Sequence, residues 1–371
     1  MDKKIILIFL AHPAHFHLFR TTIAYFKDNG VSPIVVIKSK DILEKLLNDE
    51  GVHFINILRS EKKTKSKIGL LFEAITGLII RDIKLLKIAV KHKPRLLIGT
   101  DWSVAHVGFL TSIPSIITNE DDTLATPENK YFYPFAKHLL LPSCCDKGMW
   151  LNKRISYNSY HELAYLHPDT FIPNQSVVST FNPDLQPYVL IRLVKLTASH
   201  DIGKSGLSSD LLDEIIFKLS KKFKVFITSE KPLSEKYEKY RISLNPIDIH
   251  HALFYANLFI GDSQTMAAEA GVLGTPFIRY SDFVGKIGYL NELENEYKLG
   301  FGFKTSESDA LLSKLDEIIS MSNSKKIWQA RREKMLNDKI NYSKFLIWFI
   351  DNYPNSVSVM KENPDYQYNF K

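Results

Sequence analysis

Short apolar runs alternate with helical patterns from the start of the chain, and this alternation constrains the fold more than any other feature of the sequence. The first series of runs lies at residues 5–10, 33–37, 54–57, 96–100 and 115–118. The first run is continuously apolar, which predicts a strand that is buried on both faces, and the others are short and mostly apolar. Helical patterns separate the runs, at residues 18–26 and 42–48, in a long region ending near residue 91, and at residues 104–110. Such a series predicts a parallel sheet covered by helices, which binds ligands outside the carboxyl ends of its strands.

A second alternating series begins after residue 187. Its strands are predicted at residues 188–193, 225–228, 257–260 and 277–280, with helical elements at 211–219, 249–255 and 311–320. A chain of 371 residues is also too long for one ordinary hydrophobic core. We therefore predict an α/β protein with two Rossmann-like domains, residues 1–182 and 187–340, that face a central cleft.

The segments between and after the two series have less regular patterns. Residues 131–182 contain several prolines and are expected to be irregular, so the connection between the domains is predicted at residues 182–187. In residues 341–371, the aromatic side chains of Phe345, Trp348, Phe349 and Tyr353 predict a helix that packs back on the first domain. The tail after Pro354 is polar and is expected to be mobile.

Charge and cysteine content limit the partners and the compartment. A formal net charge of +7 and a pI near 9.0 favour anionic partners, namely nucleotides, nucleic acids or acidic membrane surfaces. Cys144 and Cys145 are adjacent and are the only cysteines, which excludes a disulfide framework and predicts a reducing, cytoplasmic location. The N-terminus resembles a secretory signal, but its apolar run is short and His12 and Pro13 follow at once, so we predict a first strand there.

Basic residues surround the long helical region of the first domain. They are Lys62, Lys63, Lys65, Lys67, Arg81, Lys84, Lys87, Lys91 and Lys93. The apolar core between them, residues 68–80, is too short to span a bilayer and is interrupted by Glu73. Two interpretations remain open: an amphipathic basic helix on the anionic inner face of the cell membrane, or a helix that covers the sheet and has a lysine-rich solvated face.

The stretch at residues 257–280 contains the strongest candidate for a binding site. Residues 257–260 predict a strand, Gly261 ends it, and Asp262 or Ser263 is a natural N-cap for the Ala-rich helix that follows. A tight turn from a strand into a helix directs free backbone N–H groups and the positive end of the helix dipole outward. The turn is therefore a predicted anion site.

Polar side chains lie beside this predicted anion site. Ser263, Gln264 and Thr265 form its start, and the two hydroxyl groups add hydrogen-bond donors. Glu269 follows Thr265 by four residues, which places it about 6 Å further along the same helix face. That is the offset between the diphosphate and the ribose diol of a nucleotide. The alternative is that Asp262 only caps the helix and that Glu269 is a solvated surface charge.

The first domain offers candidates for acid and base chemistry. His12 and His15 follow the first strand in an expected turn, where histidine can act as a base or a phosphate donor. Asp101 and Glu120 end two later strands, and carboxylates suit acid and base work if burial raises one pKa. Turn and cap chemistry is the open alternative for both, and it is favoured for Asp122. No metal site is expected, because no cysteine or carboxylate lies at ligand spacing beside the histidines.

In the second domain, further polar residues follow the predicted strands. Arg192 lies on the first strand, and His200 and Lys204 lie in the glycine-containing loop after it. This loop could contact phosphate, although it is not a Walker pattern. Ser229 and Glu230 end the next strand, at the same edge of the sheet.

Four sequence segments resemble those of a known superfamily: ASHDIGKSGLS, FITSE, DIHHALFYANLFIGDSQTMAAEAGVLGTP and the GTD segment ending at Asp101. The chain resembles the GT-B superfamily of glycosyltransferases and UDP-N-acetylglucosamine 2-epimerases over residues 5–353, and within it an uncharacterised archaeal and bacterial family. The resemblance implies that the second domain binds a sugar nucleotide, with residues 261–265 at the diphosphate and Glu269 at the ribose. It also implies that the first domain supplies the acceptor side.

The epimerases of this superfamily have a downstream His-x-Glu-Ala-Gly-Leu-Arg word and two glycines at the diphosphate. Asp101 and Glu120 lie at comparable places here, but residues 118–123 lack Gly-Leu-Arg, and Gln264 and Thr265 replace the glycines. The resemblance therefore implies first a glycosyltransferase that uses a UDP-like donor and a carbohydrate or lipid-linked acceptor, without a metal or other cofactor, in surface polysaccharide or glycoconjugate synthesis. A histidine of the first turn, or Asp101, would be its base.

Two other functions stay open. An epimerase-like isomerase would depend more on Asp101, Glu120 and Glu269, and a non-catalytic sugar-nucleotide-binding protein would need only the second domain. Nucleic-acid binding is disfavoured, because the basic residues form no stripe interleaved with aromatic residues.

Overall fold

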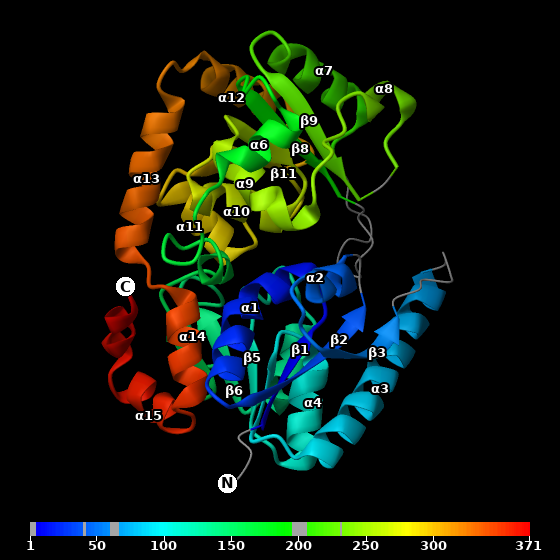
Figure 1. The fold of residues 1–371 in the computed structure, drawn as a ribbon, viewed down its shortest axis with the longest axis vertical. Coiled ribbons are helices and arrows are strands. Elements are labelled where there is room, and N and C mark those ends of the chain that lie inside the picture. The colour runs from blue at the N-terminus through cyan, green and yellow to red at the C-terminus, as the bar shows by residue number, and fades with distance from the viewer. Residues whose placement is uncertain (1–4, 40–41, 60–66, 195–205, 231) are drawn as a thin grey trace. The chain divides into compact units, whose positions relative to one another are not determined.

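The structure is a computed structural model that describes residues 5–39, 42–59, 67–194, 206–230 and 232–371. The chain divides into two compact units (Figure 1). The first comprises Met1–Tyr165 and Ile340–Lys371, and the second comprises Leu166–Lys339. Each unit is a layered α/β structure around a parallel sheet, as the alternating pattern predicted.

The described part of the first unit contains a seven-stranded parallel sheet in the order β3-β2-β1-β4-β5-β6-β7. Its strands are β1 (Ile5–Leu10), β2 (Ser32–Ser39), β3 (Phe54–Arg59), β4 (Leu96–Gly99), β5 (Ser115–Thr118), β6 (His138–Pro142) and β7 (Arg154–Tyr157). Its helices are α1 (Pro13–Asp28), α2 (Leu43–Asp49), α3 (Lys67–His92), α4 (Trp102–Thr111), α5 (Asn129–Phe132), η1 (Tyr133–Phe135), η2 (His161–Ala164), α14 (Tyr342–Asp351), α15 (Asn355–Glu362) and η5 (Pro364–Phe370).

The order of the strands determines where a ligand can bind in the first unit. From β1 the chain proceeds to β2 and β3 on one side, and then returns to β4 on the other side of β1. The strand order therefore reverses between β1 and β4, and the crevice outside their carboxyl ends is the expected ligand position. Right-handed crossovers place α1 and α2 on one face of the sheet and α3 and α4 on the other.

The second unit contains a described five-stranded parallel sheet in the order β12-β11-β10-β8-β9. Its strands are β8 (Tyr188–Leu193), β9 (Lys224–Ser229), β10 (Leu258–Gly261), β11 (Phe277–Tyr280) and β12 (Gly300–Phe303). Its helices are α6 (Gln175–Phe181), α7 (Ser209–Leu219), α8 (Glu235–Glu238), η4 (Pro246–Asp248), α9 (Ile249–Tyr255), α10 (Gln264–Leu273), α11 (Gly288–Asn295), α12 (Ser308–Ser320) and α13 (Ser324–Asp338). Here the strand order reverses between β8 and β10.

The segment expected to be irregular, residues 131–182, contains two strands of the first sheet. β6 pairs with β5, and β7 pairs with β6, both in parallel. The residues after Tyr165 belong to the second unit, so the division falls before the connection expected at residues 182–187. Phe181 packs edge to face on Tyr188 and Phe226, which ties α6 to the second sheet.

The C-terminal segment returns to the first unit, where α14 packs against α1. The Arg95 guanidinium donates to the Ile350 carbonyl oxygen at 3.2 Å. The mobile tail expected after Pro354 is instead α15 and η5. Tyr366 stacks on Trp348 with ring centroids 4.8 Å apart, and Gln367 is buried, so aromatic contacts order a segment whose composition is polar.

Candidate functional site

The turn between β10 and α10 has the geometry of an anion site. Ser263 is the N-cap of α10, and its Oγ accepts the Met266 N–H at 3.2 Å. The first N–H groups of a helix have no acceptor within the helix, so those of Gln264 and Thr265 are directed toward the carboxyl edge of the sheet. Gly261 permits the close packing behind them, because an added Cβ would lie 2.7 Å from the Arg192 carbonyl oxygen.

Asp262 ties the two central strands of this sheet together rather than capping α10. Its Oδ1 accepts the Val194 N–H at 2.8 Å, directly beyond the end of β8. Burial raises the pKa of Asp262 to about 6, although the bond from Val194 opposes the rise. A cavity of about 230 Å³ lies here and is lined by Leu193, Val194, Gly206, Leu207, Ser229, Tyr237, Asp262 and neighbouring residues. His200 and Lys204 lie outside the described residues.

Glu269 is buried, so the alternative of a solvated surface charge is wrong. Its side chain is 6 % exposed, and its Oε1 lies 3.0 Å from Nε2 of His250 on α9. His250 was not predicted as a site residue, because a contact between α9 and α10 leaves no signal in local sequence. The pair holds the carboxylate one helical turn behind the anion site.

The side chain of Gln264 is held by Arg279, a buried arginine that was not predicted from the sequence. Its amide oxygen accepts from the Arg279 guanidinium, and its amide nitrogen donates to Ser281 Oγ at 2.8 Å. Arg279 is fully buried and donates to Glu294 through Nε at 2.9 Å and Nη2 at 3.1 Å. Burial raises the pKa of Glu294, and Arg279 opposes this rise. The only signal in the sequence was a charged residue within the apolar run of β11.

Replacing Arg279 by alanine is expected to lower the free energy of unfolding by about 3–5 kcal/mol, because it leaves Glu294 buried without its cationic partner. Urea denaturation measures this loss. Arg241→Ala is the matched control, since its pair with Glu238 is exposed, and we expect a much smaller effect. Equal losses in the two variants would contradict a structural role for the buried pair.

Arg192 and Glu230 form an ion pair with each other at the rim of the same edge. Arg192 Nη2 lies 2.6 Å from Glu230 Oε1, and Nη1 donates to Thr228 Oγ1 at 2.5 Å. A ligand phosphate would therefore compete with Glu230 for this guanidinium. Ser229, which follows Thr228 in the sequence, lines the cavity of about 230 Å³ beside Asp262.

In the first unit, the histidine turn is the beginning of α1 and not a separate loop. His12 is the N-cap, and its Nδ1 accepts the Ala14 N–H at 3.2 Å, while Pro13 occupies the first helical position. The His15 ring accepts the Ala11 N–H at 3.1 Å and lies 2.9 Å from Thr100 Oγ1, beyond the end of β4. His15 therefore lies at the reversal of strand order between β1 and β4.

Asp101 caps α4, as the structural alternative proposed. Its Oδ1 accepts the Ser103 N–H at 2.9 Å and lies 3.6 Å from Nε of the buried Arg81. Asp122 has a comparable role, because its carboxylate accepts the Asp146 N–H at 2.6 Å. Both carboxylates are thus engaged in local structure.

Glu120 lies in a buried polar cluster with His161, which the sequence analysis did not identify. Glu120 Oε2 accepts the His161 N–H at 3.0 Å, and Oε1 lies 3.6 Å from His161 Nδ1. His161 Nε2 lies 2.9 Å from Thr118 Oγ1, which in turn is 2.7 Å from the Tyr342 hydroxyl. His161 occupies η2, in the segment expected to be irregular, so no pattern indicated it.

The cluster favours neutral forms of both titratable groups. Burial, followed by the charge of Glu162, raises the pKa of Glu120 well above its usual value. Burial, with a smaller contribution from His15, lowers the pKa of His161 to about 3. A protonated carboxyl group can donate a proton, whereas an imidazole with so low a pKa is a weak base and stays neutral. The structure thus brings His15, Glu120 and His161 to one edge of the first sheet.

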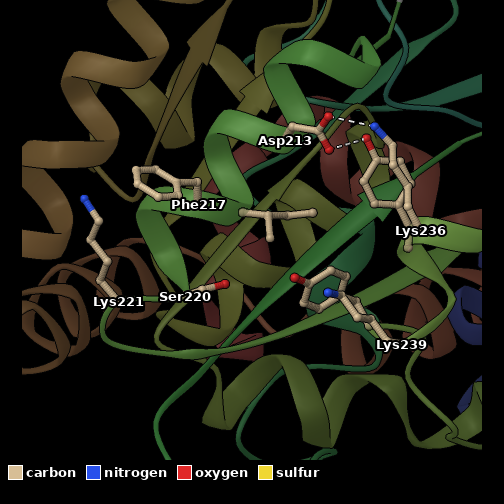
Figure 2. Close-up of a pocket in the computed structure, with 9 residues that line it drawn as sticks. Asp213, Phe217, Ser220, Lys221, Lys236 and Lys239 are labelled. Carbon is tan, nitrogen blue, oxygen red and sulfur yellow. Dashed lines mark hydrogen bonds and ion pairs between the residues drawn. The ribbon is translucent and has the colours of Figure 1, made fainter.

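A larger cavity, of about 490 Å³, lies against α7 and α8 in the second unit (Figure 2). Figure 2 shows Asp213 and Lys236 paired at its rim, and Nζ lies 2.7 Å from Oδ2. None of the predicted site residues lines this cavity, although Tyr237 lines both cavities. Among the described residues, no group of three or more His, Cys, Asp and Glu side chains is arranged to hold a metal ion.

Solved structures share the fold of this chain. A glycosyltransferase from Rickettsia africae ESF-5 is 16 % identical with a TM-score of 0.56, over 97 % of this chain and 100 % of that chain. Anabaena Alr3699/HepE, in complex with UDP and glucose, is 12 % identical with a TM-score of 0.62, over 95 % and 100 %. A UDP-GlcNAc 2-epimerase from Neisseria meningitidis, bound to UDP-GlcNAc, is 12 % identical with a TM-score of 0.60, over 93 % and 99 %. The fold is therefore of the GT-B type.

Comparison of the sequence with protein-family models assigns the chain to a family. No curated protein matches the chain. Residues 4–289 match the model of the family described as Protein of unknown function (DUF354). Because this match covers more than half of the sequence, the chain belongs to the DUF354 family.

Proposed function

We propose that the protein is a glycosyltransferase that moves a sugar from a UDP-sugar donor to a carbohydrate or lipid-linked acceptor in the synthesis of surface polysaccharide or glycoconjugates. The observation that carries the proposal is the α10 N-terminus with buried Glu269 one turn behind it. This spacing suits a nucleotide diphosphate and its ribose. The neighbouring structures that contain UDP or a UDP-sugar support the choice of uridine.

In this proposal, the second unit stabilises the leaving group. The bond between the anomeric carbon and the diphosphate breaks with its electron pair on the diphosphate oxygen. The amides at the start of α10 and the hydroxyls of Ser263 and Thr265 would offset the developing negative charge. Glu269 would accept hydrogen bonds from the ribose hydroxyls and hold the nucleotide in register.

The acceptor oxygen forms the new bond to the anomeric carbon, and its proton needs a base. His15 is the proposed base, because it lies at the reversal of strand order, whereas Asp101 is engaged in capping α4. His12 would fix the start of α1 and thereby the position of His15.

An isomerase acting on a UDP-sugar is the second candidate, and the Glu120 and His161 cluster favours it. Moving a proton on and off a sugar carbon requires a donor and an acceptor. The raised pKa of Glu120 suits the donor, while the low pKa of His161 keeps that ring neutral as a hydrogen-bond partner of the cluster. A binding protein without catalysis would use the second unit alone.

Incubation with UDP-hexoses and UDP-N-acetylhexosamines, with and without oligosaccharide or lipid-linked acceptors, distinguishes these candidates. For a transferase, we expect a glycosidic product and free UDP only when an acceptor is present. A change in sugar stereochemistry without acceptor would replace the transferase proposal by the isomerase. Binding of UDP without either product would favour the binding protein.

A further inference from the structure

Helix α3 carries a strip of exposed aliphatic side chains in addition to its buried face. Ile75, Ile79, Ile83 and Val90 are each 48–57 % exposed. At 100° per residue they lie within an arc of about 80° on one side of the helix. The buried side of α3 is different, since Leu85 and Ala89 are fully buried against the sheet. About half of the surface of each strip side chain is therefore open to solvent.

Exposed apolar side chains also occur on α4, which packs beside α3 (Figure 1). Asp82 marks the side of α3 that faces α4, because its Oδ2 lies 2.7 Å from His106 Nδ1. The strip borders this side. On α4, Phe109 and Leu110 are 63 % and 65 % exposed. We name the six side chains the α3–α4 patch: Ile75, Ile79, Ile83, Val90, Phe109 and Leu110.

A row of lysines runs along the opposite border of the strip. Lys84, Lys87 and Lys91 are exposed and lie on the side of α3 away from α4. The Lys84 Nζ donates to the Ile57 carbonyl oxygen of β3 at 2.8 Å, which shows that this side of α3 faces β3 and not α4. Within the described ranges, Lys87 and Lys91 form no salt bridge, and Glu73, near the other end of α3, is the acidic residue on this side.

We propose that the α3–α4 patch and the lysine row dock the protein on an anionic membrane surface. Aliphatic side chains can enter the boundary of the acyl chains while adjacent lysines reach the acidic headgroups. A second copy of the chain with its α3 antiparallel suits this surface less well, because that two-fold contact would bring two lysine rows together. Among the described helices, none is both long and apolar enough to cross a membrane, so α3 would lie in the surface plane.

This proposal concerns a surface and needs no assumption about the reaction. The test is co-sedimentation of the full chain with vesicles of phosphatidylcholine, alone or mixed with phosphatidylglycerol, at low and high salt. We expect binding to the mixed vesicles that weakens at high salt, because screening acts on the lysines. Lys87→Gln with Lys91→Gln should weaken binding roughly 30-fold, at about five-fold per lysine. Ile79→Gln with Ile83→Gln should weaken it at both salt concentrations.

Matched controls separate the patch from general effects of charge and hydrophobicity. Lys325→Gln with Lys326→Gln removes the same charge from α13, and Ile172→Gln changes an exposed aliphatic residue of the second unit. We expect wild-type vesicle binding from both controls. Absence of binding at low salt, or equal loss in test and control variants, would overturn the proposal. A dimer in analytical ultracentrifugation that the Ile79 and Ile83 changes abolish would assign the patch to self-association instead.

Discussion

Replacing Glu269 by alanine is expected to weaken UDP binding roughly 100-fold, because it removes a charged acceptor for the ribose hydroxyls. Calorimetry at a temperature well below the melting transition measures the affinity directly. Thermal stabilisation by UDP, GDP, CMP and ADP then tests the base. UDP should raise the melting temperature of the wild type more than the others do, and that shift should disappear in the variant.

The control for Glu269 must separate a lost ligand contact from a loosened fold. Glu292→Ala removes a carboxylate of α11, in the same unit, that pairs with Lys339 at 2.6 Å. We expect this variant to lose stability and keep its affinity for UDP. If Glu269→Ala only lowers the melting temperature and binds UDP like the wild type, Glu269 has a packing role with His250. If no nucleotide stabilises the wild type, the proposed donor site is wrong.

Replacing His15 by alanine is expected to lower kcat for sugar transfer by about 10² to 10⁴, the usual contribution of a general base. UDP affinity should not change, because the proposed nucleotide contacts belong to the other unit. Kinetics with a matched acceptor and a parallel binding measurement give this separation. His53→Ala is the control, since His53 is an exposed histidine of the same unit.

Glu120→Gln distinguishes the transferase from the isomerase in the same assay. Glutamine preserves the shape of a protonated glutamate but cannot exchange a proton. A transferase that uses His15 should retain most of its activity in this variant. A larger loss for Glu120→Gln than for His15→Ala would transfer the catalytic role to the buried cluster and support the isomerase.

Most strands and the start of α10 could be predicted, because their patterns depend on residues that are neighbours in the sequence. The apolar runs predicted β1 to β5 and β8 to β11, and the sequence around Gly261 and Ser263 predicted the start of α10. A strand buried on both faces and a capped helix each leave their pattern within a few residues. The geometry of the proposed anion site follows from these two elements alone.

Contacts between distant segments could not be predicted in this way. Glu269 lies against His250, and Arg279 fixes Gln264, because α9, α10 and β11 are adjacent in the folded unit. His161 lies in η2 and contacts Glu120, and no periodic pattern in the sequence predicts η2.

The sequence by itself determined the parallel sheets, the helix start that we propose as an anion site and the basic character of α3. Only the tertiary structure decided that Glu269 is buried, that Asp101 caps α4, and that α3 packs beside α4 with an exposed aliphatic strip. The reason is that hydrophobic periodicity and capping are local, whereas burial and the pairing of charges depend on which distant elements meet.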